Sequence, residues 1–456
     1  MKTTDPVQNY VKQHESRFVK ELLRYLSFPS ISRNRPDVYT CAKWLEEHAR
    51  NIGLHTKLYK TKGNPIVLAT TFRKRSSDKP HFVVYGHYDV QPPGEPKDWK
   101  TKPFSPEVKC GKIFGRGASD NKGQHFVHLK AVEAYLRTGR ELPCDVTFLI
   151  EGEEEIGSGS LVAFLERQKK RLACNAVIIS DTEAAELGVP ALTCSARGIV
   201  ELSIVVRGPK RNLHSGTYGG SVENPALALC KLLAQVRDEH GQITIPGFYD
   251  DVVMLSSSER KALNETRDDG KHLAETGAPL LFGEAGFTYL EQIGARPTFE
   301  VNLLASGDEK RTIIPRRAEA YITMRVVCNQ DPRAVAQLAV KYLTKLCPKT
   351  VQCSIQIGGS AKPFVLSPES RLRDVTLSVL RESFGREPLL LRGGGSIPVI
   401  REFSDRFRVD VLLVGLGLPS DNIHAPNEKF ELDHFRKGVR MSALLWERLS
   451  KEIKAC

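Results

Sequence analysis

The stretch Phe82–Val90, with the sequence FVVYGHYDV, decides how this chain folds. Its first four residues, Phe82–Tyr85, are apolar, which is typical of a short strand buried on both faces. Two polar residues, His87 and Asp89, follow where such a strand ends. The stretch therefore predicts a central strand of a parallel sheet with polar side chains at its carboxyl end.

The same pattern recurs along the first half of the chain, where strand and helix patterns alternate. We predict strands at Ile66–Phe72, Val146–Ile150 and Ala176–Ile179, and helices at Val7–Leu26, from Asp37 to about Ala49 and at Asn121–Leu136. This rhythm predicts an α/β domain with a mostly parallel sheet and helices on both faces. Ligands bind at the carboxyl ends of strands in such sheets, so the loops after these strands should converge.

The rhythm changes after residue 196, which indicates an inserted domain. The segments Gly198–Arg207 and Ala318–Val326 alternate like half-exposed strands, and helices are predicted at Pro225–Arg237 and Pro332–Leu346. We therefore expect a catalytic domain at 1–196 and 363–456, and an α+β lid or dimerisation domain at 197–362. The α/β character returns in a helix at Arg371–Phe384, a strand at Val409–Val414 and a helix at Leu432–Ile453. The polar segment Asp250–Phe287 receives no element.

Length and composition favour a cytoplasmic protein of two domains. A chain of 456 residues is too long for a single core. No run approaches 18 uninterrupted apolar residues, and the N-terminus lacks an apolar signal core, so we expect no membrane partner. Ten cysteines without CxxC pairs indicate reduced thiols. The net charge of +12 comes from dispersed Lys and Arg, so we expect no nucleic-acid partner.

A set of imidazoles and carboxylates after the apolar runs indicates a metal site. The candidates are His87, Asp89, Asp120, Glu154, Glu155, Asp181 and His424. Zinc accepts this mixture of ligands, and one carboxylate would be left for proton transfer. Each motif alone has an ordinary alternative: Asp120 could cap a helix, and Glu154 and Glu155 could be surface charges. Neighbouring carboxylates repel each other unless cations separate them, which favours the metal site.

His87 and Asp89 are separated by one residue and therefore face the same side of a strand. The Asp89 carboxylate can accept the imidazole N–H that does not face a metal, which fixes the tautomer of the ligand. The ordinary alternative is a histidine whose hydrogen bonds are satisfied near a strand end.

Taken in order, the motifs resemble those of the carnosinase-type di-zinc metallopeptidase family, whose relatives include aminoacylases, desuccinylases and bacterial carboxypeptidases. The resemblance covers nearly the whole chain. It implies two zinc ions, with manganese possible in their place. By this resemblance Asp120 bridges both ions, His87 and Asp181 complete one site, and Glu155 and His424 complete the other.

The same resemblance implies the roles of the other two residues. Glu154 matches the general base, and Asp89 matches the partner of His87. Two ions that share a hydroxide would lower its pKa, and Glu154 would move its proton to the leaving amine. Glu153 makes three consecutive glutamates, but Gly157 and Ser158 after them favour Glu154 and Glu155 as the functional pair.

Motifs of the inserted domain match substrate-binding positions of the family. By resemblance, His214 reaches the active site of a partner subunit and contributes to catalysis there, which implies a homodimer. Arg325 matches an arginine that binds the substrate carboxylate, and a structural ion pair is the alternative. Thr312, Gly395 and Ser396 match further substrate contacts, and the glycines at 393–395 let the backbone approach a ligand closely.

The sequence therefore predicts a cytoplasmic di-zinc dipeptidase that binds small peptides. An aspartate at position 181, where carboxypeptidase-like relatives tend to carry glutamate, favours dipeptidase or aminopeptidase action. One alternative is an N-acyl-amino-acid amidohydrolase with the same metals and base. A second is an inactive scaffold protein, which the presence of every expected ligand disfavours.

Overall fold

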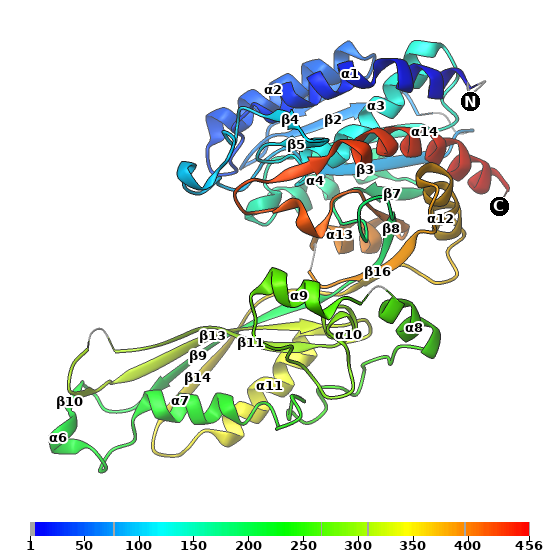
Figure 1. Cartoon of the computed structure of the whole chain (residues 1–456). Coiled ribbons are helices and arrows are strands. Elements are labelled where there is room, and N and C mark those ends of the chain that lie inside the picture. Colours follow the sequence, from blue (N-terminus) through cyan, green and yellow to red (C-terminus); the bar gives the residue numbers. More distant parts are fainter. Residues whose placement is uncertain (1–4, 76–77, 266, 308–309, 396–397, 456) are drawn as a thin grey trace. The chain divides into compact units, whose positions relative to one another are not determined.

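Figure 1 shows the computed structural model, which describes residues 5–75, 78–265, 267–307, 310–395 and 398–455. These residues form two compact units. The first contains the chain up to Cys194, Leu366–Leu391 and the chain from Glu402 onward. The second contains Ser195–Val365 and Arg392–Arg401, so it is inserted in the sequence of the first. The predicted ranges placed 392–401 in the catalytic domain, whereas the structure groups this segment with the second unit.

One large mixed sheet forms the centre of the first unit. Seven of its strands, in spatial order, are β1 (His55–Tyr59), β2 (Ile66–Thr70), β6 (Asp145–Glu151), β3 (His81–His87), β7 (Ala176–Ile179), β17 (Asp410–Gly415) and β8 (Ala191–Ala196). The short strands β15 (Phe364–Val365) and β16 (Leu389–Gly393) both pair with β8. The four central strands β6, β3, β7 and β17 are parallel, and the strands on both sides of them pair antiparallel. The predicted α/β class is confirmed, with the parallel part of the sheet confined to its buried centre.

Helices pack against this sheet and against one another. They are α1 (Pro6–Leu26), α2 (Arg35–Asn51), α3 (Lys122–Thr138), α4 (Leu161–Arg167), α5 (Lys169–Leu172), α12 (Arg371–Phe384) and α14 (Leu432–Ala455). Helix α3 lies between β3, α1 and α14, and its residues Lys122–Tyr135 are all buried. Gly86 of β3 permits this approach, because a Cβ atom there would lie 2.7 Å from Cβ of His125. The end of β3 therefore lies directly against the start of α3.

The carboxyl ends of the central strands meet at one edge of the sheet. The parallel register pairs His87 with Glu151 and Tyr85 with Ile179, so β3, β6 and β7 end at nearly the same level. A small sheet, formed by β4 (Glu107–Lys109), β5 (Lys112–Phe114) and β18 (Lys429–Glu431), joins the segments before α3 and after His424. The loops after β3, β6 and β7 and the two segments joined by the small sheet are thereby brought to one place.

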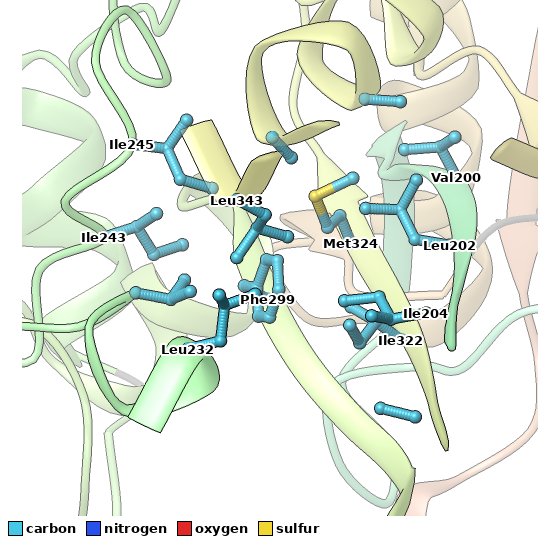
Figure 2. Packing of buried hydrophobic residues seen from close by; sticks show 14 of the residues in the cluster. Val200, Leu202, Ile204, Leu232, Ile243, Ile245, Phe299, Ile322, Met324 and Leu343 are labelled. Atoms are coloured by element: carbon cyan, nitrogen blue, oxygen red, sulfur yellow. The ribbon is translucent and has the colours of Figure 1, made fainter. Parts of the chain in front are cut away.

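The second unit is an α+β unit, as predicted. Its antiparallel sheet consists of β11 (Thr298–Ser306), β13 (Arg317–Val326), β9 (Gly198–Arg207) and β14 (Gln352–Ala361), in this order. Helices α7 (Pro225–Ala234) and α11 (Pro332–Leu346) pack on it. Figure 2 shows the core between them, where Leu202, Met324 and Leu343 are buried. Burial alternates along β9 and β13, which explains why the period-two pattern predicted both strands.

Further elements of the second unit were not predicted. They include β10 (Leu213–His214), α6 (Ser215–Tyr218), α8 (Ser257–Glu265), α9 (Asp269–Thr276), α10 (Tyr289–Ala295), β12 (Ile313–Ile314) and β15 (Phe364–Val365). The segment 250–287, which received no element, thus contains two helices of mostly polar residues. Two more elements, β16 (Leu389–Gly393) and α13 (Pro398–Phe407), cross the boundaries between the units. Within the described ranges, no helix is long and apolar enough to cross a membrane.

Candidate metal centre

His87 is held at the end of β3 by its neighbour Asp89. The Nδ1 atom of His87 lies 3.1 Å from the backbone oxygen of Asp89 and 3.5 Å from its Oδ1 atom. Both are acceptors, so Nδ1 carries the proton and Nε2 presents its lone pair on the other side of the ring. Asp89 accepts hydrogen bonds from Ser32 Oγ and from the backbone N–H groups of Glu154 and Glu155. The predicted pairing of the two residues is therefore present, through the backbone as well as the side chain.

Asp120 lies between the two imidazoles of the site. Its Oδ1 atom is 3.0 Å from Nε2 of His87, and its Oδ2 atom is 2.8 Å from Nε2 of His424. Nε2 of His424 also lies 3.3 Å from Oε2 of Glu155, while Nε2 of His87 lies 3.7 Å from Oδ2 of Asp181. One carboxylate thus connects two sets of donors, as expected of a bridging ligand.

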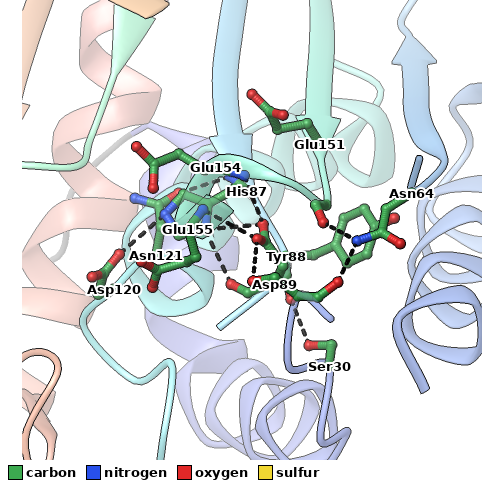
Figure 3. Close-up of polar contacts among 12 residues, drawn as sticks. Ser30, Asn64, His87, Tyr88, Asp89, Asp120, Asn121, Glu151, Glu154 and Glu155 are labelled. Atoms are coloured by element: carbon green, nitrogen blue, oxygen red, sulfur yellow. Dashed lines mark hydrogen bonds and ion pairs between the residues drawn. The ribbon is translucent and has the colours of Figure 1, made fainter. Parts of the chain in front are cut away.

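The structure brings together two groups that could each hold an ion, and they share Asp120. In each group the ligand atoms all lie within 4.8 Å of one another; the groups are His87, Asp120 and Asp181, and Asp120, Glu155 and His424. Figure 3 shows how the loops after β3 and β6 and the start of α3 bring His87, Glu155 and Asp120 to one place. The residues grouped in this way are the ones predicted as ligands, in the same two sets.

The chemistry of these side chains fits divalent cations. Nε2 of His87 is buried and has no hydrogen-bond partner among the described residues, which is costly unless a ligand occupies its lone pair. Burial opposes protonation of His87, yet the nearby carboxylates of Asp120 and Asp181 raise its pKa well above the usual value. Hydrogen bonds to Asp120 and Glu155 raise the pKa of His424 to about 10. A site that stabilises positive charge on both imidazoles would also stabilise metal ions there.

The three consecutive glutamates have different surroundings. Glu153 is buried and accepts hydrogen bonds from the backbone N–H groups of Asn64 and Ser160, so its carboxylate fixes two loops. Glu154 and Glu155 begin the short 3-10 helix η2 (Glu154–Ile156). Glu155 accepts a hydrogen bond from Nε2 of Gln91, and it belongs to the second ligand group. Because the Glu153 carboxylate is occupied by backbone N–H groups, Glu154 and Glu155 are the two glutamates available to the candidate metal site.

The carboxyl group of Glu154 lies among other charged groups of the site. Burial raises the pKa of its carboxyl to about 8; the nearby positive charge of His87 lowers this pKa, and the carboxylates of Asp181 and Asp120 raise it. Bound cations beside Glu154 would bring this pKa down again, towards neutrality. A carboxyl group that titrates near neutral pH suits a general base, because it can accept a proton and return it.

Two positioning residues of the site were not predicted. Glu428 is fully buried, and its carboxylate accepts hydrogen bonds from the backbone N–H groups of Gly117, Ser119 and Asp120 and from the Arg116 guanidinium. Burial raises the pKa of Glu428 to about 7. The only signal in the sequence is its place four residues after His424, since a glutamate in a polar loop resembles a surface residue.

Asn121 is the other positioning residue, and it connects two candidate ligands. Its Nδ2 atom donates to Oδ1 of Asp181 at 2.7 Å, and its Oδ1 atom accepts the backbone N–H of His87 at 3.2 Å. Asn121 therefore fixes the orientation of the Asp181 carboxylate, which lies in the loop after β7. An amide side chain at a helix start gives no sign of this contact in the sequence.

The predicted substrate contacts belong to the second unit. His214 is exposed in β10 and lies opposite Ile313 of β12, and the backbone N–H of Ser215 donates to the oxygen of Thr312 at 3.0 Å. Arg325 is half-buried in β13, where burial lowers its pKa. Gly395 is exposed, and Ser396 lies outside the described residues. The roles of these residues stay predictions.

Comparison with known proteins identifies the family. Residues 83–448 match the model of "Peptidase family M20/M25/M40". The chain belongs to this family. It is 29% identical to the Cys-Gly metallodipeptidase dug1 of Schizosaccharomyces pombe, over 96% of each protein.

Solved structures of family members have the same fold. Human carnosine dipeptidase 1 superposes with a TM-score of 0.81, at 25% identity over 98% of each chain. The metallo-carboxypeptidase Sso-CP2 of Sulfolobus solfataricus gives a TM-score of 0.82, at 30% identity over 95% of this chain and 99% of that one. The predicted family resemblance is confirmed, and so is the predicted enzyme class, a metallopeptidase that hydrolyses peptide bonds.

Proposed function

We propose that this chain is a dipeptidase that binds two divalent cations, with zinc as the expected metal and manganese as the alternative. One ion would be held by His87, Asp181 and Asp120, and the other by Asp120, Glu155 and His424. The observation that supports this most strongly is the pair of donor groups that share Asp120. The names of relatives similar over almost the whole chain, the Cys-Gly metallodipeptidase and the Beta-Ala-His dipeptidase, support dipeptides as substrates.

The chemistry divides between the cations and the side chains. When bound, the two ions would lower the pKa of a water molecule and polarise the scissile carbonyl group. Glu154 would accept the proton of the attacking water and deliver it to the leaving amine. Asp89 keeps Nδ1 of His87 protonated, so that Nε2 remains a ligand. Glu428 fixes the backbone before Asp120 and thereby the position of the bridging carboxylate.

Residues of the second unit would recognise the substrate. Arg325 would bind the free carboxylate of the dipeptide, because its planar guanidinium can form two parallel hydrogen bonds. His214 would stabilise the oxyanion in the active site of a partner subunit, which requires a homodimer. Thr312, Gly395 and Ser396 would contact the peptide. We expect the dimer to act in the cytoplasm.

The proposal can be tested on the purified full-length chain. Metal analysis should find two zinc ions per chain, and removal of the ions by a chelator should abolish activity that added zinc or manganese restores. A panel should include Cys-Gly, β-Ala-His and longer peptides beside N-acetyl and N-succinyl amino acids. Rapid hydrolysis of the dipeptides alone is expected. Hydrolysis of only the N-acyl compounds would identify an amidohydrolase, and a metal-loaded protein without activity would indicate a scaffold.

A further inference from the structure

Arg197 connects three segments of the second unit through backbone carbonyl groups. This residue directly precedes β9. Its Nε atom donates to the oxygen of Gly394 at 2.8 Å, and its Nη1 atom lies 3.3 Å from the oxygens of both Gln292 and Arg296. The backbone N–H of Arg197 also donates to the oxygen of Gly393. One residue thus ties the glycine-rich segment 393–395 to the end of α10 and to the start of β9.

The glycine-rich segment fits closely against these partners. A Cβ atom at Gly394 would lie 2.5 Å from Cγ2 of Ile293 and 3.4 Å from Nη2 of Arg197. On the facing helix, a Cβ atom at Gly294 would lie 2.8 Å from Cβ of Arg392. The two chain segments therefore approach each other through glycines on both sides, and a side chain at either position would separate them. The position of the segment depends on this packing and on Arg197.

Arg197 also lies near the proposed carboxylate-binding arginine. Arg325 pairs with Ile199 in the register of β13 with β9, and Ile199 is two residues after Arg197. Burial, together with the positive charge of Arg325, lowers the pKa of Arg197 to about 10. In the described part of the chain the side chain of Arg197 donates to backbone carbonyl oxygens, and the Glu300 carboxylate raises its pKa only in part. Two arginine charges therefore act on one region of the second unit.

We propose that Arg197 is the positioning residue of the carboxylate-binding region: it fixes the segment 393–395 beside Arg325 and adds a second positive charge. This inference rests on the proposed function, in which Arg325 binds the substrate carboxylate and Gly395 contacts the peptide. Arginine can hold this segment because its planar guanidinium group donates hydrogen bonds to several carbonyl oxygens at once. Lysine carries the same charge on a single nitrogen. The two contributions, geometry and charge, can therefore be separated by substitution.

The test compares Arg197→Lys and Arg197→Gln with the wild type, on a dipeptide and on the corresponding dipeptide amide. Both variants loosen the segment, so kcat should fall by about tenfold or more on both substrates. Only Arg197→Gln removes the charge, so only this variant should also raise KM, and only for the dipeptide with its free carboxylate. Since a lysine retains the charge, Arg197→Lys should keep KM within about threefold of the wild type on both substrates.

Arg296→Lys provides the matched control. Arg296 is buried in the same unit, but its guanidinium pairs with the Glu284 carboxylate and lies over the ring of Phe287. This variant should lower Tm without a difference between the two substrates.

The outcomes distinguish this inference from the proposed function. Wild-type kcat and KM in both Arg197 variants overturn it, as does a lower Tm with unchanged kinetics per folded molecule. A wild-type protein that hydrolyses neither substrate overturns the proposed function together with the inference. If Arg197→Gln does not fold, Arg197→Lys still decides the geometric part, because a loss of kcat per folded molecule is not a consequence of reduced stability, which lowers only the fraction of folded enzyme.

Discussion

The candidate centre of the first unit and the candidate substrate residues of the second differ in charge and in organisation. The centre gathers carboxylates from loops that follow parallel strands, and its candidate ligands range from the buried His87 to the exposed His424. The second unit presents arginines, Arg197 and Arg325, on an antiparallel sheet, and His214, Thr312 and Gly395 are exposed. Carboxylates favour cations and arginines favour anions, so the two regions have opposite chemical preferences.

The difference in organisation explains why the sequence alone predicted that the residues of the first region lie together, but not those of the second. Parallel strands bring their carboxyl ends to one edge, so polar residues after separate apolar runs meet without further information. An antiparallel sheet has no such edge, and residues such as Arg325 and His214 lie on separate elements. Substitutions in each region should separate the two kinds of chemistry, with the largest loss of activity at the metal centre.

The largest effect is expected at the centre. Glu154→Gln should retain both ions but lose kcat by roughly a thousandfold or more, since the proton carrier is lost. Asp120→Ala should lose metal, because both donor groups depend on this carboxylate. Metal content and kcat measured on each variant check the two expectations. Glu153→Gln is the matched control: it should reduce stability more than kcat, because among the described residues Glu153 accepts hydrogen bonds from backbone N–H groups. Near-normal turnover of Glu154→Gln would assign the base elsewhere.

The second effect tests whether the two regions act across a dimer. His214→Ala should retain its metal and be nearly inactive, because an oxyanion donor is missing. A heterodimer of this variant with Glu154→Gln would contain one intact site and one site with both defects. Mixing the variants under subunit exchange should therefore restore activity, with heterodimers verified by different tags. No recovery in verified heterodimers would place His214 in the active site of its own chain.

A smaller effect is expected for the carboxylate-binding arginine. Arg325→Ala should reduce kcat/KM for a dipeptide by roughly 2–5 kcal/mol in activation free energy, since a charge-assisted pair is lost. The dipeptide amide, which lacks the carboxylate, should be affected far less. Arg207→Ala, an exposed arginine at the other end of β9, is the control and should change neither substrate. Equal losses on both substrates would assign Arg325 a structural role.

The smallest effect concerns the opposite end of β3, where a histidine has a purely structural environment. His81 is buried, with Nδ1 at 2.7 Å from the oxygen of Ala173 and Nε2 at 2.8 Å from Oγ1 of Thr147. Burial lowers the pKa of His81 to about 4. Since this value lies below that of the unfolded chain, about 6.5, the stabilisation is complete above pH 6.5 and is lost as the pH falls towards 4.

This histidine should account for about 2 kcal/mol of the unfolding free energy lost between pH 7 and pH 5. His81→Gln should therefore show a smaller loss over this range than the wild type in urea unfolding experiments. His240→Gln, which changes an exposed histidine of the second unit, should keep the wild-type dependence. The same pH dependence in His81→Gln and wild type would contradict a buried neutral His81.

Local patterns predicted the elements whose burial is regular. The helix at Arg371–Phe384 and the strand at Gly198–Arg207 have the predicted bounds, because apolar residues recur at the period of the element. The edge strands β1 and β11 were missed, since mostly exposed strands lack a clear alternation. In the segment 250–287, Asp268 caps the start of α9 and Gly277 follows its end. Such capping residues are weak signals for a helix when the residues around them are also polar.

The sequence by itself determined which chemistry is present: imidazoles and carboxylates after apolar runs, in the order of a known family. Only the tertiary structure decided how they are arranged. It placed Asp120 between His87 and His424, directed Glu153 to backbone N–H groups, and buried Glu428 beneath the bridging residue. These contacts join residues up to 308 positions apart, and those of Glu153 and Glu428 go to backbone N–H groups, which nearly every residue type has. A local pattern cannot specify such partners, because they exist only once the loops have adopted their folded conformation.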